Sequence, residues 1–230
     1  VFGRRGGFSS VTQLDQLDGV SGFRIELPPT ETSDRLKVSG AGDLNGDGLS
    51  DVVITSPESR SSESSPHGEC YILFGGREGS SASVSVASLN GTNGFRITGE
   101  GGHDYLGVSV DGAGDFNGDG FLDIAVSNDA PDRKLIYFND GKGNFKIGAE
   151  FGLPEWPTRN LSVADINADG LPDIILANRG DSPTSNYICI NRGSGLFNAN
   201  CIPFAPYPVT TITPADFNKD GFIDLAVPHR

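Results

Sequence analysis

Short apolar runs, separated by turns rich in glycine, asparagine and aspartate, dominate the hydrophobic pattern of this chain. The strongest runs cover residues 52–55, 124–126, 174–176 and 225–227. They are rich in β-branched residues and nearly continuously apolar, which is typical of strands buried between neighbouring sheets. No segment shows the periodicity of an amphipathic helix. The pattern therefore predicts an all-β fold.

Further strands are predicted after three of these runs, at residues 70–74, 134–138 and 187–190. The last two lead into hairpin turns at 139–143 and 191–195, where asparagine and glycine can adopt positive φ angles. Each unit then consists of a short strand, an Asp-rich loop, an apolar strand, a turn and two more strands. The 32 glycines and 14 prolines among 230 residues suit such a chain of short strands and turns.

An internal repeat sets the order of these elements. Residues 17–25 recur as residues 89–97, 72 positions later. An Asp-rich nonapeptide begins at Asp43, Asp115, Asp165 and Asp216, at steps of 72, 50 and 51 residues. Four strands in about 50 to 70 residues make one blade of a β-propeller, whose radial packing leaves only short edges.

We therefore expect a β-propeller fragment made of four-stranded blades. The predicted segments are the end of a preceding blade at 1–34, blades at 35–99, 100–150 and 151–205, and the start of a further blade at 206–230. The chain contains no methionine and both of its ends lie in strand-like runs. It is therefore expected to be part of a longer protein, whose remaining blades complete the ring.

The four nonapeptides share the pattern Asp-x-Asn-x-Asp-Gly-x-x-Asp. Alternate side-chain oxygens and the backbone carbonyl of position seven can converge on one hard cation, and the glycine permits the sharp turn. Such oxygens fit Ca²⁺, whereas the absence of histidine and cysteine from the loops argues against zinc or copper. The predicted ligands of up to four Ca²⁺ ions are Asp43, Asn45, Asp47, Leu49 and Asp51; Asp115, Asn117, Asp119, Phe121 and Asp123; Asp165, Asn167, Asp169, Leu171 and Asp173; and Asp216, Asn218, Asp220, Phe222 and Asp224.

Two alternatives compete with this interpretation. An EF-hand begins in the same way but needs a glutamate at position twelve. The residues there are Ile54, Val126, Leu176 and Val227. The aspartate at position nine is therefore expected to close the site. The second alternative is a set of turns without metal, because Asp, Asn and Gly favour turns anyway; four copies with the same acidic spacing favour the metal.

The charge balance agrees with bound calcium. With 17 basic and 30 acidic residues the net charge is −13, which excludes the basic footprint that nucleic-acid binding requires. Twelve of the acidic residues lie in the four loops, where they would repel one another without a counter-ion. Four Ca²⁺ ions would change the net charge to −5. No apolar run approaches the roughly 18 residues of a membrane helix, so no membrane span is expected in this segment.

With these motifs the chain resembles the FG-GAP repeats of the integrin α-subunit propeller. The resemblance is carried by residues 40–51 and 71–75. From Asp115 onward, the shorter spacing and the hairpin at 137–145 resemble VCBS repeats, a related group. The resemblance implies a propeller in which these loops bind structural calcium. It makes 35–99 an FG-GAP-type blade and 151–205 a VCBS-type blade.

Three further features carry predictions of their own. Cys189 and Cys201 flank the second hairpin and could form a disulfide, with two buried free thiols as the alternative. Cys70 would then be free or paired outside the chain. Asn90 and Asn160 begin glycosylation sequons. Residues 179–181 spell the integrin-recognition tripeptide Arg-Gly-Asp, on a turn where these residue types are expected anyway.

No catalytic constellation is visible. His67, His103 and His229 are far apart and none lies in a nucleophile motif. His67 follows a serine-rich stretch, which is typical of a loop at the surface. We therefore expect a non-enzymatic, calcium-stabilised propeller, extracellular or at the cell surface, that recognises a protein or a glycan. The alternatives are a propeller module of a secreted polysaccharide- or lipid-processing enzyme and an architectural component of a surface filament or matrix.

Overall fold

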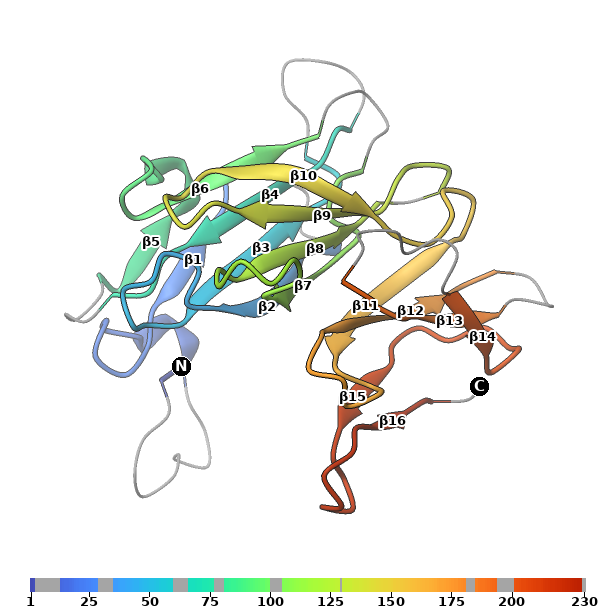
Figure 1. Cartoon of the computed structure of the whole chain (residues 1–230). Helices are drawn as coiled ribbons and strands as arrows, with labels where there is room; N and C mark the ends of the chain where they lie inside the picture. Colours follow the sequence, from blue (N-terminus) through green and yellow to red (C-terminus); the bar gives the residue numbers. More distant parts are fainter. Residues whose placement is uncertain are drawn as a thin grey trace.

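The computed structural model describes residues 1–2, 13–28, 35–59, 66–76, 81–99, 105–128, 130–180, 185–193 and 201–228. Within these residues three four-stranded antiparallel sheets follow one another along the chain (Figure 1). The first sheet contains β2 (Lys37–Gly42), β3 (Asp51–Ser56), β4 (Glu69–Leu73) and β6 (Gly94–Thr98). The second contains β7 (Ser109–Gly114), β8 (Asp123–Ser127), β9 (Leu135–Asn139) and β10 (Phe145–Glu150). The third contains β11 (Thr158–Ala164), β12 (Asp173–Asn178), β13 (Asn186–Cys189) and β14 (Cys201–Phe204).

Smaller elements lie before and after these sheets. At the C-terminal side, β15 (Thr213–Ala215) pairs with β16 (Asp224–Ala226) in the antiparallel sense. At the N-terminal side, β1 (Arg24–Glu26) pairs in parallel with β5 (Ser83–Ser85), a pairing that the sequence pattern did not predict. The helical elements in the described residues are two short 3₁₀ turns, η1 (Leu14–Gln16) and η3 (Val86–Ser88). The prediction of an all-β propeller fragment with four-stranded blades is confirmed.

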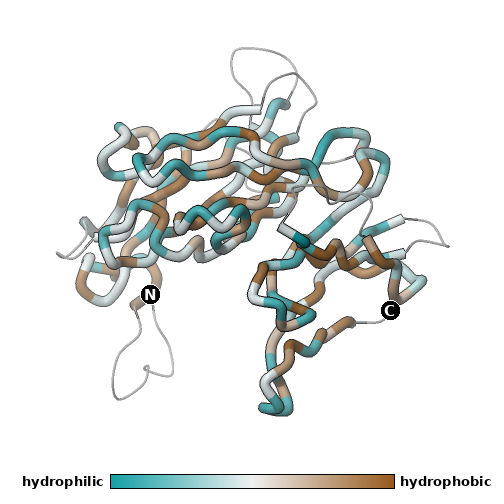
Figure 2. Tube along the Cα trace, viewed as in Figure 1, coloured by the Kyte–Doolittle hydropathy of each residue, from teal (hydrophilic) through white to brown (hydrophobic). Residues whose placement is uncertain are grey.

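The second strand of each sheet is apolar on both faces because each face packs on a different neighbour. In β8, Ile124 and Val126 belong to the cluster shared with the first sheet, whereas Ala125 belongs to the cluster shared with the third. In β12, Ile174 and Ile175 divide in the same way between the second sheet and the segment leading to β15. Burying one such side chain contributes about 1.5–3 kcal/mol. The hydropathy colouring along the chain trace in Figure 2 shows the hydrophobic runs on the strands, whose side chains form the clusters between successive sheets.

The first strands of successive sheets lie side by side and are joined by side-chain hydrogen bonds. Asp111 on β7 accepts a hydrogen bond from the Ser39 hydroxyl of β2 (2.7 Å) and another from the Val163 N–H of β11 (3.1 Å). Burial raises the pKa of the Asp111 carboxyl. Further along, the Ser162 hydroxyl donates to the carbonyl of Ile212 (2.9 Å). These bonds fix the stagger between neighbouring blades.

A disulfide joins the third and fourth strands of the third sheet, β13 and β14. Cys189 and Cys201 are bonded and face one another in the register of β13 and β14, as the sequence predicted. Cys70 is buried on β4 as a free thiol, and burial raises its pKa to about 12. In the part of the chain that the structure describes, no helix has the length and apolar character to cross a membrane.

Candidate calcium-binding loops

Each Asp-rich nonapeptide connects the first strand of a sheet to the second. Its last residue, the aspartate at position nine, is the first residue of the second strand. The loops join β2 to β3, β7 to β8, β11 to β12 and β15 to β16. This placement, between the first strand and the apolar second strand of each sheet, agrees with the predicted order of elements. All four loops are covered by the described residues.

The side chains at positions one, three and five fold over the backbone of their own loop. In the first loop the two carboxylate oxygens of Asp43 accept hydrogen bonds from the N–H groups of Asp47 (3.0 Å) and Gly48 (2.8 Å). Asn45 Oδ1 accepts from the same Asp47 N–H (3.1 Å), and Asp47 Oδ1 accepts from the Leu49 N–H (2.8 Å). The corresponding bonds of the other three loops are 2.8–3.1 Å long. Four separate sequences therefore adopt one geometry.

The sharp turn of each loop depends on two residues with left-handed backbone. The glycines at position six have φ angles of 85°, 91°, 87° and 91°, which only glycine adopts readily. Position four is also left-handed in every loop, at Gly46, Gly118, Ala168 and Lys219. The requirement at position four was not predicted from the motif, since two of its four residues are not glycine.

In the first three loops the aspartate at position nine is buried and bound to two backbone N–H groups, whereas Asp224 in the fourth is half-buried and accepts from the Phe217 N–H. Asp51 accepts from Leu44 (2.7 Å) inside the loop and from Gly75 (2.8 Å) at the end of the third strand of its sheet. Asp123 and Asp173 make the equivalent pairs of bonds. Burial raises the pKa of all three carboxyls, that of Asp123 to about 6. The hydrogen bonds from the backbone N–H groups act in the opposite direction and offset only part of this rise. This residue ties the loop to the sheet.

The donor chemistry of the loops fits a hard cation. In the part of the chain described here, no three His, Cys, Asp or Glu side chains converge on a point that could hold a metal ion. Each loop nevertheless presents only oxygen donors at positions one, three, five and seven, and a carboxylate or amide oxygen that accepts one N–H keeps a second lone pair. Oxygen-only sets are typical of Ca²⁺ and unlike the nitrogen and sulfur sets of zinc. The ligand set itself stays a prediction.

In the first three loops position two anchors the loop in the core, a role that the sequence analysis did not assign, whereas Phe217 in the fourth loop is 59% exposed. Leu44 and Phe116 are buried and belong to the clusters between successive sheets. Ile166 packs against the cluster beneath the fourth loop. The apolar residue at this position in all four nonapeptides was the available signal.

The hairpins after the third strands differ from the prediction in one respect. Positive φ angles occur at Gly141, Gly143 and Gly193, and not at Asn139, the last residue of β9, or at Asn191, two residues after the end of β13. Both asparagines are buried, at 2% and 0% exposure. Each side-chain oxygen accepts from the N–H of a hairpin glycine, Gly141 or Gly193, and each side-chain nitrogen donates to a loop of the neighbouring blade.

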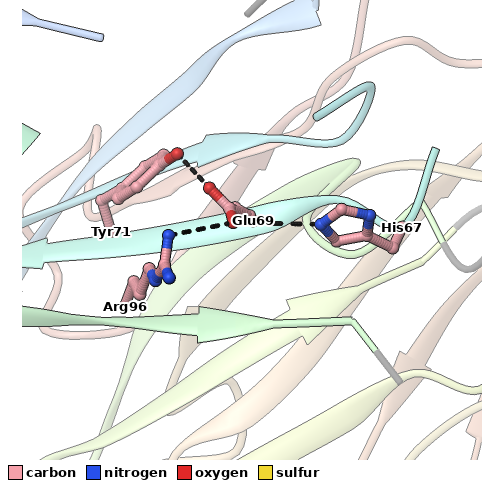
Figure 3. Close-up of polar contacts among 4 residues, drawn as sticks. All are labelled: His67, Glu69, Tyr71 and Arg96. Atoms are coloured by element: carbon pink, nitrogen blue, oxygen red, sulfur yellow. Dashed lines mark hydrogen bonds and ion pairs between the residues drawn. The ribbon is translucent and has the colours of Figure 1, made fainter. Parts of the chain in front are cut away.

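His67 is buried at 7% exposure, so its predicted place in a surface loop was wrong. Its N–H donates to the Ser59 carbonyl and its carbonyl accepts from Leu106 of the next blade, which draws the residue inward. It belongs to a polar cluster around Glu69 (Figure 3). The Glu69 carboxylate accepts from the Tyr71 hydroxyl and lies 3.5 Å from Arg96 Nη1 and 3.9 Å from His67 Nε2. The cluster joins the start of β4 to β6.

The two glycosylation sequons and the start of the Arg-Gly-Asp tripeptide lie at separate places in the structure. Asn90 is exposed, and its Oδ1 accepts from the hydroxyl of Thr92, the third residue of its sequon (2.6 Å). Asn160 lies on β11, where its Oδ1 accepts from the Ile212 N–H (3.2 Å) and its Nδ2 lies 3.5 Å from Ser109 Oγ. Arg179 and Gly180 directly follow β12. Asp181, His103 and His229 lie outside the described residues.

Comparison with known proteins agrees with this geometry. The FG-GAP-like repeat family matches residues 43–126, 115–176 and 165–227. Each match begins at the first aspartate of one loop and ends in, or one residue after, the strand that follows the next loop. The chain therefore belongs to the FG-GAP-like repeat family.

Curated relatives with detectable similarity include integrin α subunits. The chain is 28% identical over 154 residues to integrin alpha-6 of Homo sapiens, a match that covers 62% of this chain and 12% of that protein. It is 38% identical over 88 residues to integrin alpha-M of Mus musculus, covering 37% and 7%. Integrin alpha pat-2 of Caenorhabditis elegans is 30% identical over 118 residues, covering 50% and 9%. The chain spans only 7–12% of the length of these relatives.

Proposed function

We propose that this chain is an extracellular or cell-surface propeller segment whose loops bind up to four Ca²⁺ ions, and that the assembled propeller recognises a protein or glycan without catalysis. The carrying observation is the recurrence of one oxygen-donor geometry in four loops of different sequence. In this function calcium holds the loops in place and takes no part in a reaction. The similarity to integrin α subunits and the disulfide support an extracellular location.

The proposal includes the blade boundaries and the ligand residues. The ranges 35–99, 100–150 and 151–205 each contain the strands of one four-stranded sheet. β15 and β16 fall in 206–230, and β1 falls in 1–34. The proposed ligands are positions one, three, five, seven and nine of each loop, with position nine already bound to two backbone N–H groups in three of the four.

Calorimetric titration with calcium tests the metal site. The full chain is expected to bind up to four ions with dissociation constants of about 10⁻⁴ to 10⁻³ M, the range of extracellular modules. Asp119→Asn removes one charged donor from the second loop and should weaken or abolish one site. Asp140→Asn is the matched control, because Asp140 is an exposed turn aspartate outside the four loops. An absence of calcium binding by the parent chain would overturn the proposal.

Binding of the full-length parent protein to a glycan panel, with calcium and then with EGTA, tests the recognition step. Calcium-dependent glycan binding identifies the ligand class. No binding to the panel by a folded protein directs the search to protein ligands, for which pull-down with extracellular proteins is the next assay. Turnover of a bound polysaccharide would contradict the non-enzymatic part of the proposal.

A further inference from the structure

The side-chain amide of Asn139 touches two Asp-rich loops at once. Its Nδ2 donates one hydrogen bond to the carbonyl of Leu44 (2.7 Å), position two of the first loop. The same nitrogen donates a second bond to the carbonyl of Leu122 (3.1 Å), position eight of the second loop. Leu44 and Asn139 are 95 residues apart and belong to different blades. One buried amide group therefore joins neighbouring loops.

The other polar groups of Asn139 are also used. Its backbone N–H donates to Asp123 Oδ1 (2.9 Å), and its own Oδ1 accepts from the Gly141 N–H (3.0 Å). The residue is 2% exposed. All of its hydrogen-bonding groups except the carbonyl thus hold either a loop or the hairpin that follows, which leaves the side chain a single arrangement.

Asn191 repeats this arrangement one blade further along. Its Nδ2 donates to the carbonyl of Phe116 (3.1 Å), position two of the second loop, and its backbone N–H donates to Asp173 Oδ1 (2.7 Å) in the third loop. Its Oδ1 accepts from the Gly193 N–H (2.9 Å). The two asparagines therefore share three hydrogen bonds: one to the carbonyl at position two of the preceding loop, one to the aspartate at position nine of their own loop, and one from a hairpin glycine.

The first blade has glycine at this place. The Gly75 N–H donates to Asp51 Oδ1 (2.8 Å), just as the asparagine N–H groups do in the later blades. Gly75 has no side chain to reach sideways to another loop. The lateral bond is thus a feature of the second and third blades.

These bonds form one continuous path through three loops. The N–H of Leu44 donates to Asp51 and its carbonyl accepts from the Asn139 side chain, and the backbone N–H of Asn139 donates to Asp123. Asp123 also accepts from the N–H of Phe116, whose carbonyl accepts from the Asn191 side chain. All of these residues are at most 2% exposed. A displacement of one loop must therefore move the donor that the next loop shares.

We propose that Asn139 and Asn191 are positioning residues that couple calcium binding in the first, second and third loops. The inference rests on the proposed calcium function. An ion in one loop orders the peptide that its asparagine holds, and the neighbouring loop then binds its own ion with less ordering to complete, which makes binding positively cooperative. Because such coupling is reciprocal, loss of either loop weakens the other by the same factor.

Site-resolved calcium titration of the full chain by NMR tests the coupling. The amide signals of Gly48, Gly120 and Gly170 each report one loop. Asp47→Ala disables the first loop and should weaken calcium binding at Gly120 about fivefold, the factor expected when one buried hydrogen bond is at stake. In an Asn139→Ala background the same Asp47→Ala change should leave the Gly120 midpoint unmoved.

A matched control and a second pair of variants separate coupling from simple loss of stability. Asn144→Ala removes an exposed hairpin asparagine whose side chain donates to Asp140 and should leave the coupling intact. Asn191→Ala should uncouple the second loop from the third while the first and second stay coupled. General destabilisation would instead weaken all three sites alike.

The outcomes decide between the two proposals. If Asp47→Ala leaves the Gly120 midpoint unchanged in the parent, or shifts it equally without Asn139, the coupling is overturned while the calcium function stands. If calcium moves none of the three glycine signals, both are overturned. If Asn139→Ala does not fold, Asn191→Ala decides the inference: disabling the second loop by Asp119→Ala should weaken calcium binding at Gly170 in the parent and leave it unmoved in the Asn191→Ala background, and an equal shift in both would overturn the proposal.

Discussion

Position four of each Asp-rich loop has a left-handed backbone whether or not it is glycine. Gly46 and Gly118 have φ angles of 75° and 77°, and Ala168 and Lys219 have φ angles of 59° and 63°. A Cβ placed on Gly46 or Gly118 would meet nothing within 4 Å. The third and fourth loops therefore adopt the left-handed conformation at a residue that carries a Cβ, where the first two loops have glycine.

Replacement of Ala168 by glycine should stabilise the fold. The left-handed conformation costs a residue with a Cβ about 1–2 kcal/mol. Part of this gain is lost because glycine makes the unfolded chain more flexible. We expect Ala168→Gly to raise the free energy of unfolding by about 0.5–1 kcal/mol, measured by urea denaturation. Ala164→Gly, in the extended strand just before the loop, is the control and should lower it.

The first strands of neighbouring sheets approach closely at one glycine and leave space at its equivalent. A Cβ on Gly112 of β7 would lie 3.1 Å from the Cα of Ala41 and 3.2 Å from the carbonyl of Gly40 on β2. Gly40, 72 residues earlier in the repeat, has nothing within 4 Å of its own Cβ position. Close packing of the two strands therefore favours glycine at position 112, whereas the space around Gly40 would accept a side chain.

Alanine at these two glycines should have opposite consequences. Gly112→Ala forces β2 and β7 apart and should lower the free energy of unfolding by about 1–3 kcal/mol. Gly40→Ala should be neutral or slightly stabilising. Thermal denaturation of both variants measures the difference. Equal destabilisation would show that the close approach of β2 and β7 is not what disfavours a side chain at Gly112.

The disulfide stabilises the outer edge of the third sheet. The bond between Cys189 and Cys201 closes a loop with a sequence separation of 12 residues. A loop of about 15 residues gives roughly 3 kcal/mol in the chain-entropy view. The double substitution of both cysteines by alanine should lower the thermal midpoint accordingly. The thermal midpoint should fall by the same amount when the disulfide of the parent chain is reduced. Cys70→Ala tests whether the buried free thiol contributes to the stability of the fold.

At the scale of the whole molecule, the blades are held together by interfaces that repeat from sheet to sheet. Apolar clusters lie between successive sheets, and side-chain hydrogen bonds link the first strands and the loops of neighbouring blades. The chain also carries a net charge of −13. Ions bound at the loops would therefore lower the electrostatic repulsion within the molecule.

Calcium should raise the stability of the full chain. At a concentration about 100 times the dissociation constant, each occupied loop adds about 2.7 kcal/mol to the free energy of unfolding. Thermal denaturation with calcium and then with excess EGTA measures the effect, with Mg²⁺ at the same concentration as the control. Identical midpoints in calcium and EGTA would contradict a structural role for the ion.

Much of the fold and of the candidate site could be predicted because it is local. The strands 52–55, 124–126 and 174–176 were recognised from continuous apolar residues, and the loops from the spacing of Asp, Asn and Gly. The pairing of Cys189 with Cys201 followed from their positions on either side of one hairpin. Turn chemistry and strand alternation act between residues close in sequence, so a single repeat contains the information.

The sequence alone thus determined the all-β class, the four-stranded blades, the order of the loops and their donor chemistry. Only the tertiary structure decided which residues meet between blades: the amide of Asn139 beneath a loop 95 residues away, the burial of His67, and the parallel pairing of β1 with β5. The physical reason is that these contacts join residues far apart in the sequence. Contacts between blades depend on how the sheets stack, and no periodicity within one repeat specifies the partner that the next blade presents.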